Sequence, residues 1–329
     1  MRWKSMNYYL YKIGFDAAVH FGVSSSAQSL NVSEDHFCAD TLFSALCHTA
    51  LSLRGQNGLE QFCFAAKEGQ LLLSDSMPWL NDTFYLPRPF VSSQGEHDIP
   101  ASKRKAVKKL KWIPIEDISA FAVSIQGGDV YDAESAQVEF GVNTSTAKVR
   151  IMQGEDSMPY QVGLYHFKDN AGLWFIAGCG SKQLADDLQI LVEGLSYSGI
   201  GGKTSAGYGK YHIDDLIYLN EPFDTTTQWL FSSLEKISAS RQILLSTSLP
   251  SEEELALLLP DAEYMLTRRA GFIQSSSYAE ENRKKKSQVF LAAGSVLPSR
   301  FKPVLYDVGE TGKHPVYRLS APIFLGVEL

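Results

Sequence analysis

The amino-acid sequence predicts an α+β protein built from two ferredoxin-like domains with inserted loops. Between residues 9 and 214, strand-like and helix-like segments follow one another in the order strand, helix, strands, helix, strand. This is the element order of a ferredoxin-like unit. A second alternation begins after a polar linker near residue 220, and the length of 329 residues suits two domains. We therefore predict a first domain over residues 1–220 and a second over 221–329.

The elements at the start of the chain follow from hydrophobic periodicity and cap residues. Residues 9–16 alternate between apolar and polar side chains, as in a half-buried strand. Asp40 precedes an amphipathic helix over 41–54, which Gly55 ends, and a shorter helix is expected over 59–67. We interpret Asp40 as the N-cap of this helix rather than as a catalytic acid, because capping accounts for an aspartate there.

The middle of the chain predicts a projection, a hairpin and a second helix. Residues 141–160 are polar and irregular, so we expect a projecting loop or loose hairpin. Strands over 162–167 and 173–177 should pair across a short turn. A serine-capped helix is expected over 181–193, and a strand over 207–214 should follow it.

The second half predicts one helix among several short strands. Ser251 and Glu254 form a capping box at the start of that helix. The expected strands cover 229–234, 264–273, 288–297, 316–319 and 323–327.

Residues 199–209, called the glycine loop below, read Gly-Ile-Gly-Gly-Lys-Thr-Ser-Ala-Gly-Tyr-Gly. Glycine permits positive φ and close backbone approach. Successive free N–H groups in such a loop form a concavity that binds anions. Lys203 adds a positive charge, and Tyr208 and Tyr211 offer flat faces on which bases can stack. We therefore predict that the loop holds a sugar-phosphate backbone, in the first place RNA.

Spacing excludes two other phosphate-binding motifs for this loop. Gly202-Lys203-Thr204 resembles the end of a P-loop, but the first glycine of that motif would fall at Tyr197. Counted from Gly199, a dinucleotide fingerprint would require a glycine where Thr204 stands. A plain glycine-rich turn between two elements is the remaining alternative.

Charge and composition limit the functions that the chain can have. The net charge is −7, so RNA binding would depend on a local basic patch. Residues 103–111 carry six basic side chains, which form either a solvated helix face or a contact with RNA or protein. The absence of a Cys-x-x-Cys pair and of any membrane-length apolar run predicts a reduced, cytoplasmic protein with no membrane partner. Gly127-Gly128-Asp129 resembles the Gly-Gly-Asp-Asp signature of nucleotide cyclases and polymerases, but Val130 replaces the second aspartate. A paired-metal site is therefore not supported, and we expect no metal and no cofactor.

Four stretches of the chain carry a resemblance to a known family: 39–46, the glycine loop, 268–273 with 288–296, and 314–318 with 325–328. Together they resemble the RAMP (repeat-associated mysterious protein) superfamily of CRISPR systems. Within it, the best agreement is with the family of type III-A Csm effector subunits that cap the 5′ end of the crRNA. At Ala39 the chain departs from the serine expected there, a difference that affects helix capping.

This resemblance implies a non-catalytic, RNA-binding subunit of an antiviral complex that holds the repeat-derived 5′ handle of the crRNA. It implies docking to the large polymerase-cyclase-like subunit and to the first repeated RAMP backbone subunit. It also gives residues 141–160 the place of a projecting thumb. The residues assigned to RNA are Gly199, Gly201, Gly202, Lys203, Thr204, Ser205, Gly207, Tyr208, Arg268 and Arg269.

Two other functions stay open on the sequence. The same superfamily contains metal-independent crRNA-processing endoribonucleases, which can use a histidine as general acid or base near the glycine loop. His20 is the candidate here, although a structural role at a strand end is the simpler interpretation. A protein-only scaffold, whose basic tracts meet acidic partners, would also suit the net charge of −7.

Overall fold

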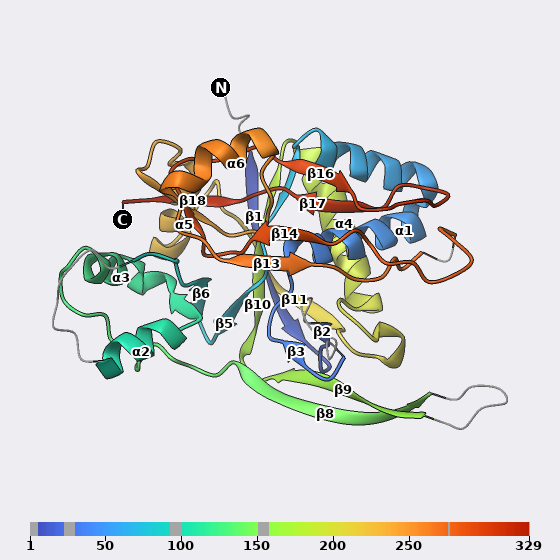
Figure 1. The fold of residues 1–329 in the computed structure, drawn as a ribbon, viewed down its shortest axis with the longest axis horizontal. Coiled ribbons are helices and arrows are strands. Elements are labelled where there is room, and N and C mark those ends of the chain that lie inside the picture. The colour runs from blue at the N-terminus through green and yellow to red at the C-terminus, as the bar shows by residue number, and fades with distance from the viewer. Residues whose placement is uncertain (1–5, 23–29, 93–100, 151–157, 276, 329) are drawn as a thin grey trace.

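The computed structural model combines helices with antiparallel sheets and describes residues 6–22, 30–92, 101–150, 158–275 and 277–328 (Figure 1). This confirms the predicted mixture of helix and strand. No helix within these ranges has the length and apolar character needed to cross a membrane.

The strands of the largest sheet are, in spatial order, β11 (Tyr211–Tyr218), β1 (Asn7–Phe15), β10 (Ala171–Cys179), β5 (Met77–Leu80), β6 (Thr83–Pro87) and β7 (Trp112–Pro114), with β4 (Leu71–Leu73) on β10. β1 pairs antiparallel with β10 on one side and with β11 on the other. β10 also pairs with β4 and β5, and the sheet continues through β6 to β7.

The predicted hairpin between residues 162–167 and 173–177 is wrong. β9 (Met158–Phe167) pairs with β8 (Gly141–Arg150), whereas β10 pairs with β1, β4 and β5. The reason is burial. Every residue of β10 is buried, so this strand lies in the middle of the large sheet. β9 instead joins β8 in a two-stranded ribbon that projects from the body, as Figure 1 shows in green.

Two helices from the first half pack against each other beside the large sheet. α1 (Ala39–Lys67) contains a non-helical Gly55 with φ 67° and ψ −166°, which confirms the predicted break between two helical segments. α4 (Lys182–Ser198) begins as predicted, since Ser181 Oγ accepts a hydrogen bond from the Leu184 N–H at 3.2 Å.

Asp40 is not the N-cap of α1, and that prediction is wrong. The helix begins two residues earlier, at Ala39, so the N-cap position falls on Cys38 and Asp40 lies in the first turn. The carboxylate of Asp40 has other partners, as described below, and these compete with the helix N–H groups for it.

The second half consists of small sheets and short helices. Residues 229–234 lie in α5 (Thr225–Glu235) rather than in a strand, because a capping box between Asp224 and Thr227 starts a helix there. α6 (Glu252–Leu258) carries the predicted Ser251–Glu254 capping box. The strands are β12 (Arg241–Leu244), β13 (Leu266–Arg269), β14 (Gln288–Leu291), β15 (Val296–Leu297), β16 (Val304–Asp307), β17 (Tyr317–Ser320) and β18 (Phe324–Val327).

The remaining short elements connect these layers. They are β2 (Phe21–Gly22), β3 (Ser33–Glu34), α2 (Ala101–Lys109), α3 (Ile118–Ile125), and three 3₁₀ turns: η1 (Ile115–Asp117), η2 (Thr204–Ala206) and η3 (Leu259–Asp261).

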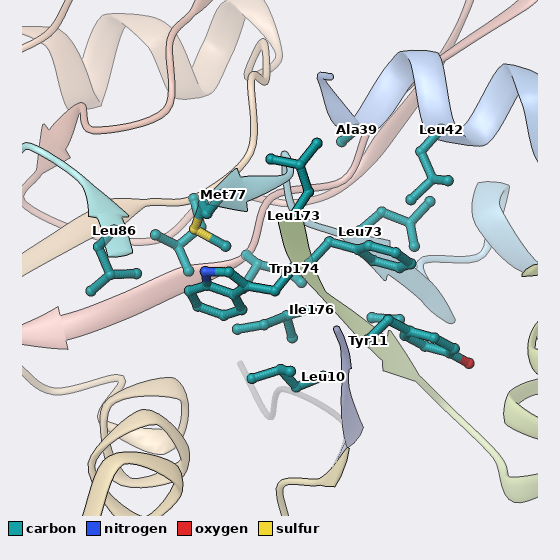
Figure 2. Close-up of a cluster of buried hydrophobic side chains, with 14 of the residues drawn as sticks. Leu10, Tyr11, Ala39, Leu42, Leu73, Met77, Leu86, Leu173, Trp174 and Ile176 are labelled. Carbon is teal, nitrogen blue, oxygen red and sulfur yellow. The ribbon is translucent and has the colours of Figure 1, made fainter. Parts of the chain in front are cut away.

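The core is continuous between the two halves of the chain. Trp174 on β10 is fully buried among side chains of β1, β4 and β5 (Figure 2), and the same cluster extends to Leu230 and Leu325 in the second half. A buried polar contact reinforces this join. Asp75 accepts hydrogen bonds from the Ala39 N–H at 2.8 Å, from the Thr247 N–H at 2.9 Å and from Thr247 Oγ1 at 2.6 Å.

Candidate nucleic-acid interface

The glycine loop runs from the end of α4 back to the edge of the large sheet. Gly199 ends the helix with a positive φ of 85°, and its N–H donates to the Leu195 carbonyl at 2.7 Å. The Ile200 N–H then donates to the Gly209 carbonyl at 2.9 Å, which closes the loop on itself. A Cβ atom on Gly209 would lie 2.1 Å from the Ile200 carbonyl oxygen, so only glycine fits there.

The tip of the loop has the geometry of an anion-binding concavity. Lys203 adopts the left-handed region with φ 61° and ψ 27°, and the 3₁₀ turn η2 begins directly after it. The N–H groups of Thr204 and Ser205 stand at the start of this turn and donate to no other residue among those described. Together with the exposed Lys203 ammonium and the two neighbouring hydroxyls, they can bind a phosphate group.

Residues 18–20 hold the glycine loop against the β8–β9 ribbon. The carbonyls of Ala18 and His20 accept the N–H groups of Gly209 and Gly202 at 2.9 and 2.8 Å. Val19 forms a two-way backbone bridge with Tyr165 of β9. The loop and the ribbon therefore keep a fixed relation through one short backbone segment.

His20 is a buried member of this segment, with 6% of its surface exposed. Its Nδ1 lies 2.7 Å from the Gly163 carbonyl, so Nδ1 carries the proton and donates it to that oxygen. The ring edge faces Gly202, where an added Cβ atom would lie 2.6 Å from His20 Cδ2. The observed contacts of His20 thus join the glycine loop to β9.

Tyr208 and Tyr211 have different environments. Tyr208 is partly exposed, and Lys148 Nζ lies 5.4 Å from the centre of its ring. Tyr211 is 4% exposed and donates its hydroxyl to the Val192 carbonyl at 2.6 Å. The expected stacking role of Tyr211 is therefore wrong. The strand that follows also begins later than predicted, at Tyr211, and leaves Tyr208 in the loop.

Arg268 and Arg269 lie on β13, whose partner is β14 (Figure 1). Successive strand residues point to opposite faces, so the two arginines diverge. Arg268 is exposed and its Nε donates to Ser287 Oγ at 2.7 Å. Arg269 points inward, where its Nε and Nη2 donate to the two carboxylate oxygens of Asp40 at 3.1 and 2.5 Å. Ser287 lies outside the glycine loop, so this hydrogen bond of Arg268 does not join it to Lys203 and its neighbours.

Asp40 is the centre of a buried ion-pair cluster that sequence reasoning missed. Besides Arg269, the Nε of Arg318 on β17 lies 3.5 Å from Asp40 Oδ2, and both side chains are almost inaccessible. Burial alone would raise the pKa of Asp40, but Arg269 and Arg318 hold it below its ordinary value. Burial, assisted by the two arginines, lowers the pKa of the neighbouring Lys285. The members of the cluster are far apart in the sequence, so no local spacing indicates it. Their opposite charges are the one signal that the sequence offers.

The basic run over 103–111 divides between solvent and an acidic neighbour. Lys105, Lys108 and Lys109 are exposed on α2, and the side chains of Lys103 and Arg104 lie outside those that the structure describes. Lys111 lies 2.6 Å from Asp35 and 3.4 Å from Glu34, so its charge is compensated within the chain. Among the described residues, Glu34, Asp35 and His36 are the group whose ligand atoms are close enough to hold a metal ion, and Lys111 already occupies two of its carboxylates.

Comparison with known proteins identifies the family of this chain. A model of the CRISPR Csm4 C-terminal domain matches residues 238–327. A Csm4 protein of Mycobacterium tuberculosis is 32% identical over 324 residues, which cover 98% of each chain. The chain belongs to the Csm4 family. The predicted membership of a type III-A Csm subunit family is thereby confirmed.

More distant Csm4 proteins share the sequence or the fold across nearly the whole length. The Streptococcus thermophilus Csm4 is 28% identical over 332 residues, covering 98% of this chain and 100% of that protein. The Csm4 family chain also resembles a chain in the crystal structure of a Csm3–Csm4 subcomplex of the type III-A interference complex, with a TM-score of 0.65, 15% identity and coverage of 98% and 100%. A Csm1–Csm4 cassette bound to pppApA gives a TM-score of 0.58, 16% identity and 99% coverage of both chains.

Proposed function

We propose that this Csm4-family chain is a non-catalytic RNA-binding subunit of a type III-A CRISPR interference complex, in which it holds the 5′ handle of the crRNA. The observation that carries the proposal is the tip of the glycine loop. There, the Lys203 ammonium, the N–H groups of Thr204 and Ser205, and their hydroxyls belong to consecutive residues of one backbone turn. This set of donors is suited to phosphate and reads no base.

Both halves are assigned to ferredoxin-like units in this proposal, over residues 1–220 and 221–329. In support, β1, α1, β4, β10, α4 and β11 follow one another along the chain, and their strands stand side by side in the order β11, β1, β10, β4. In the second half, β12 is paired antiparallel with both β15 and β18, with α6 between β12 and β13 in the sequence.

The partners follow from the assemblies of the relatives. Solved Csm4 chains occur in a Csm1–Csm4 cassette and in a Csm3–Csm4 subcomplex. We extend both contacts to this chain, with Csm1 as the large polymerase-cyclase-like subunit and Csm3 as the repeated backbone subunit. The projecting β8–β9 ribbon takes the place of the thumb, which continues the RNA path away from the glycine loop.

Binding of RNA by single-site variants tests the proposal. Lys203→Ala and Arg268→Ala remove one exposed cation each, and Lys182→Ala is the matched control. Lys182 is also exposed but stands at the opposite end of α4, about 25 Å from the loop by helix rise. The assay is fluorescence anisotropy of a labelled single-stranded RNA of handle sequence over a salt series.

Loss of one phosphate contact should weaken binding and reduce the slope of log K against log salt by about 0.7. When a tagged chain is expressed with its Csm partners, less crRNA should co-purify with the double variant Lys203→Ala/Arg268→Ala than with the wild type. Wild-type affinity and salt slope in the double variant would refute the site. A purified complex with no RNA near this subunit would favour the protein-only scaffold.

The nuclease alternative has one structural argument in its favour, which is the contact between His20 and the glycine loop. We nevertheless propose no catalytic role, since His20 is buried and its Nδ1 proton is engaged by Gly163. Incubation of the pure chain with repeat RNA in EDTA decides between the two. Specific cleavage that His20→Ala abolishes would replace our proposal with a metal-independent endoribonuclease.

A further inference from the structure

We infer that the RNA site extends from the glycine loop onto the β8–β9 ribbon. Lys148 and Tyr160 of the ribbon, with Lys203 and Tyr208 of the loop, form a cation–aromatic quartet that binds one unpaired nucleotide. The inference rests on the proposed RNA-binding function and adds two residues that no motif assigned to it. The ligand is single-stranded RNA, one base of which is unstacked from its neighbouring bases.

The quartet is built from two reciprocal contacts. Lys148 and Tyr160 stand directly opposite each other in the ladder of the ribbon. Lys148 Nζ lies 5.4 Å from the ring centre of Tyr208, and Lys203 Nζ lies 5.0 Å from the ring centre of Tyr160. Lys203 Nζ is also 3.4 Å from the Tyr160 hydroxyl. Each element therefore supplies one cation and one aromatic ring to the other.

A small apolar cluster supports the two rings from below. Tyr160 and Tyr208 both pack on a cluster of Ala18, Val162 and Leu164. The backbone bonds from Ala18 to Gly209 and from Val19 to Tyr165 connect the same elements. The rings are therefore positioned before any ligand arrives, which lowers the entropic cost of binding.

The charges of the quartet favour a nucleic acid. Neither Lys148 nor Lys203 forms an ion pair with the described carboxylates, although the chain carries a net charge of −7. Two cations without a carboxylate partner, each over an aromatic ring, match a phosphate joined to a base. The free N–H groups of Thr204 and Ser205 follow directly after Lys203, so the next phosphate has donors as well.

The bound strand must be single at this point. A base in a duplex has both faces stacked on its neighbours, so it presents no face to a tyrosine. Stacking on an aromatic side chain also tolerates any base. The quartet thus binds a phosphate and the face of an unpaired base, without preference for sequence.

Anisotropy with the full chain tests this inference, with a single-stranded handle RNA and a duplex of equal length as probes. Tyr160→Ala and Tyr208→Ala should each weaken single-strand binding roughly tenfold. Lys148→Ala should weaken it and lower the salt slope by about 0.7. Tyr160→Phe keeps the ring and should bind almost as the wild type does. Lys168→Ala is the matched control, because Lys168 is exposed directly after β9 and outside the quartet.

The outcomes separate this inference from the proposed function. Suppose that Lys148→Ala and Tyr160→Ala bind RNA as the wild type does, whereas Lys203→Ala binds weakly. The RNA site would then be confined to the glycine loop, which would overturn this inference and leave the proposed function standing. Wild-type binding by Lys203→Ala and Arg268→Ala would refute the RNA site itself. An equal loss for duplex RNA would contradict stacking of an unpaired base. Thermal unfolding of each variant checks the fold, and Lys148→Gln, on a partly exposed side chain, replaces any tyrosine variant that fails to fold.

Discussion

The guanidinium of Arg269 donates to both carboxylate oxygens of Asp40, although 229 positions separate the two residues in the sequence. This contact connects β13 in the second half with the first turn of α1 in the first half. The preceding residue, Arg268, points to the other face of the same strand and stays exposed. Two consecutive arginines thus have different environments, one in the core and one at the surface.

Arg269→Ala should lower the free energy of unfolding by about 3–5 kcal/mol, because it leaves the buried Asp40 carboxylate without its main partner. Arg268→Ala should change it by less than about 0.5 kcal/mol, as expected for an exposed side chain. Urea unfolding followed by circular dichroism measures both values. Equal stability of the two variants would show that the ion pair does not hold the halves together.

Asp40 should also make stability depend on pH in acid. The pKa of Asp40 is lower in the folded chain than its ordinary value of 3.8, because Arg269 and Arg318 outweigh the effect of burial. Its contribution is therefore complete above about pH 5 and is lost as the pH falls toward the folded pKa. Asp40→Asn removes this titration, so the stability gap between wild type and variant should narrow below about pH 4. A gap that stays constant on acidification would contradict the assignment.

The glycines of the loop should differ in their tolerance of alanine. Gly209 and Gly207 both have positive φ, of 76° and 89°. A Cβ atom on Gly209 meets the Ile200 carbonyl, whereas one on Gly207 meets nothing within 4 Å. Gly207→Ala should therefore cost about 1–2 kcal/mol of backbone strain, and Gly209→Ala should cost more and also weaken RNA binding. Thermal unfolding measures the loss of stability in each variant, and anisotropy measures the loss of RNA affinity. A larger loss of stability for Gly207→Ala than for Gly209→Ala would refute the geometry of the loop.

Cys47 and Cys63 should react with iodoacetamide at different pH values. Their sulfur atoms lie 3.9 Å apart across the break in α1. The hydrogen bond from Cys47 lowers the pKa of Cys63 below its ordinary value of 9.0, and the same contact, with burial, raises the pKa of Cys47. Alkylation should reach Cys63 first as the pH rises. Cys47→Ala should move the pH midpoint of Cys63 upward, and mass spectrometry of peptides measures it.

Local patterns in the sequence predicted the helices well and the strand pairing poorly. Gly55 and Ser181 act on their immediate neighbours, so the break in α1 and the start of α4 followed from the residues themselves. The helix over 225–235 was missed because its short apolar run suggested a strand, although the cap at Asp224 was a usable signal. β10 pairs with strands far along the chain, and no local pattern specifies such partners.

The candidate site shows the same division between local and distant information. The glycine loop was found from composition, since positive φ and close backbone approach select glycine at Gly209. The inward direction of Arg269 depends on the position of Asp40, and the burial of Tyr211 depends on Val192. These contacts arise only when separate elements meet, so spacing along the chain could not distinguish the two arginines or the two tyrosines.

The shared core has a consequence for how the chain is made. The buried carboxylates of Asp40 and Asp75 belong to the first half, whereas their partners Arg269, Arg318 and Thr247 lie beyond residue 240. Synthesis proceeds from the N-terminus, so the first half leaves the ribosome with both charges lacking these partners. A product of premature termination would keep this defect permanently and would be exposed to cellular proteases. Only a chain that extends through Arg318 on β17 supplies all three of these partners, so the folded first half depends on the second half.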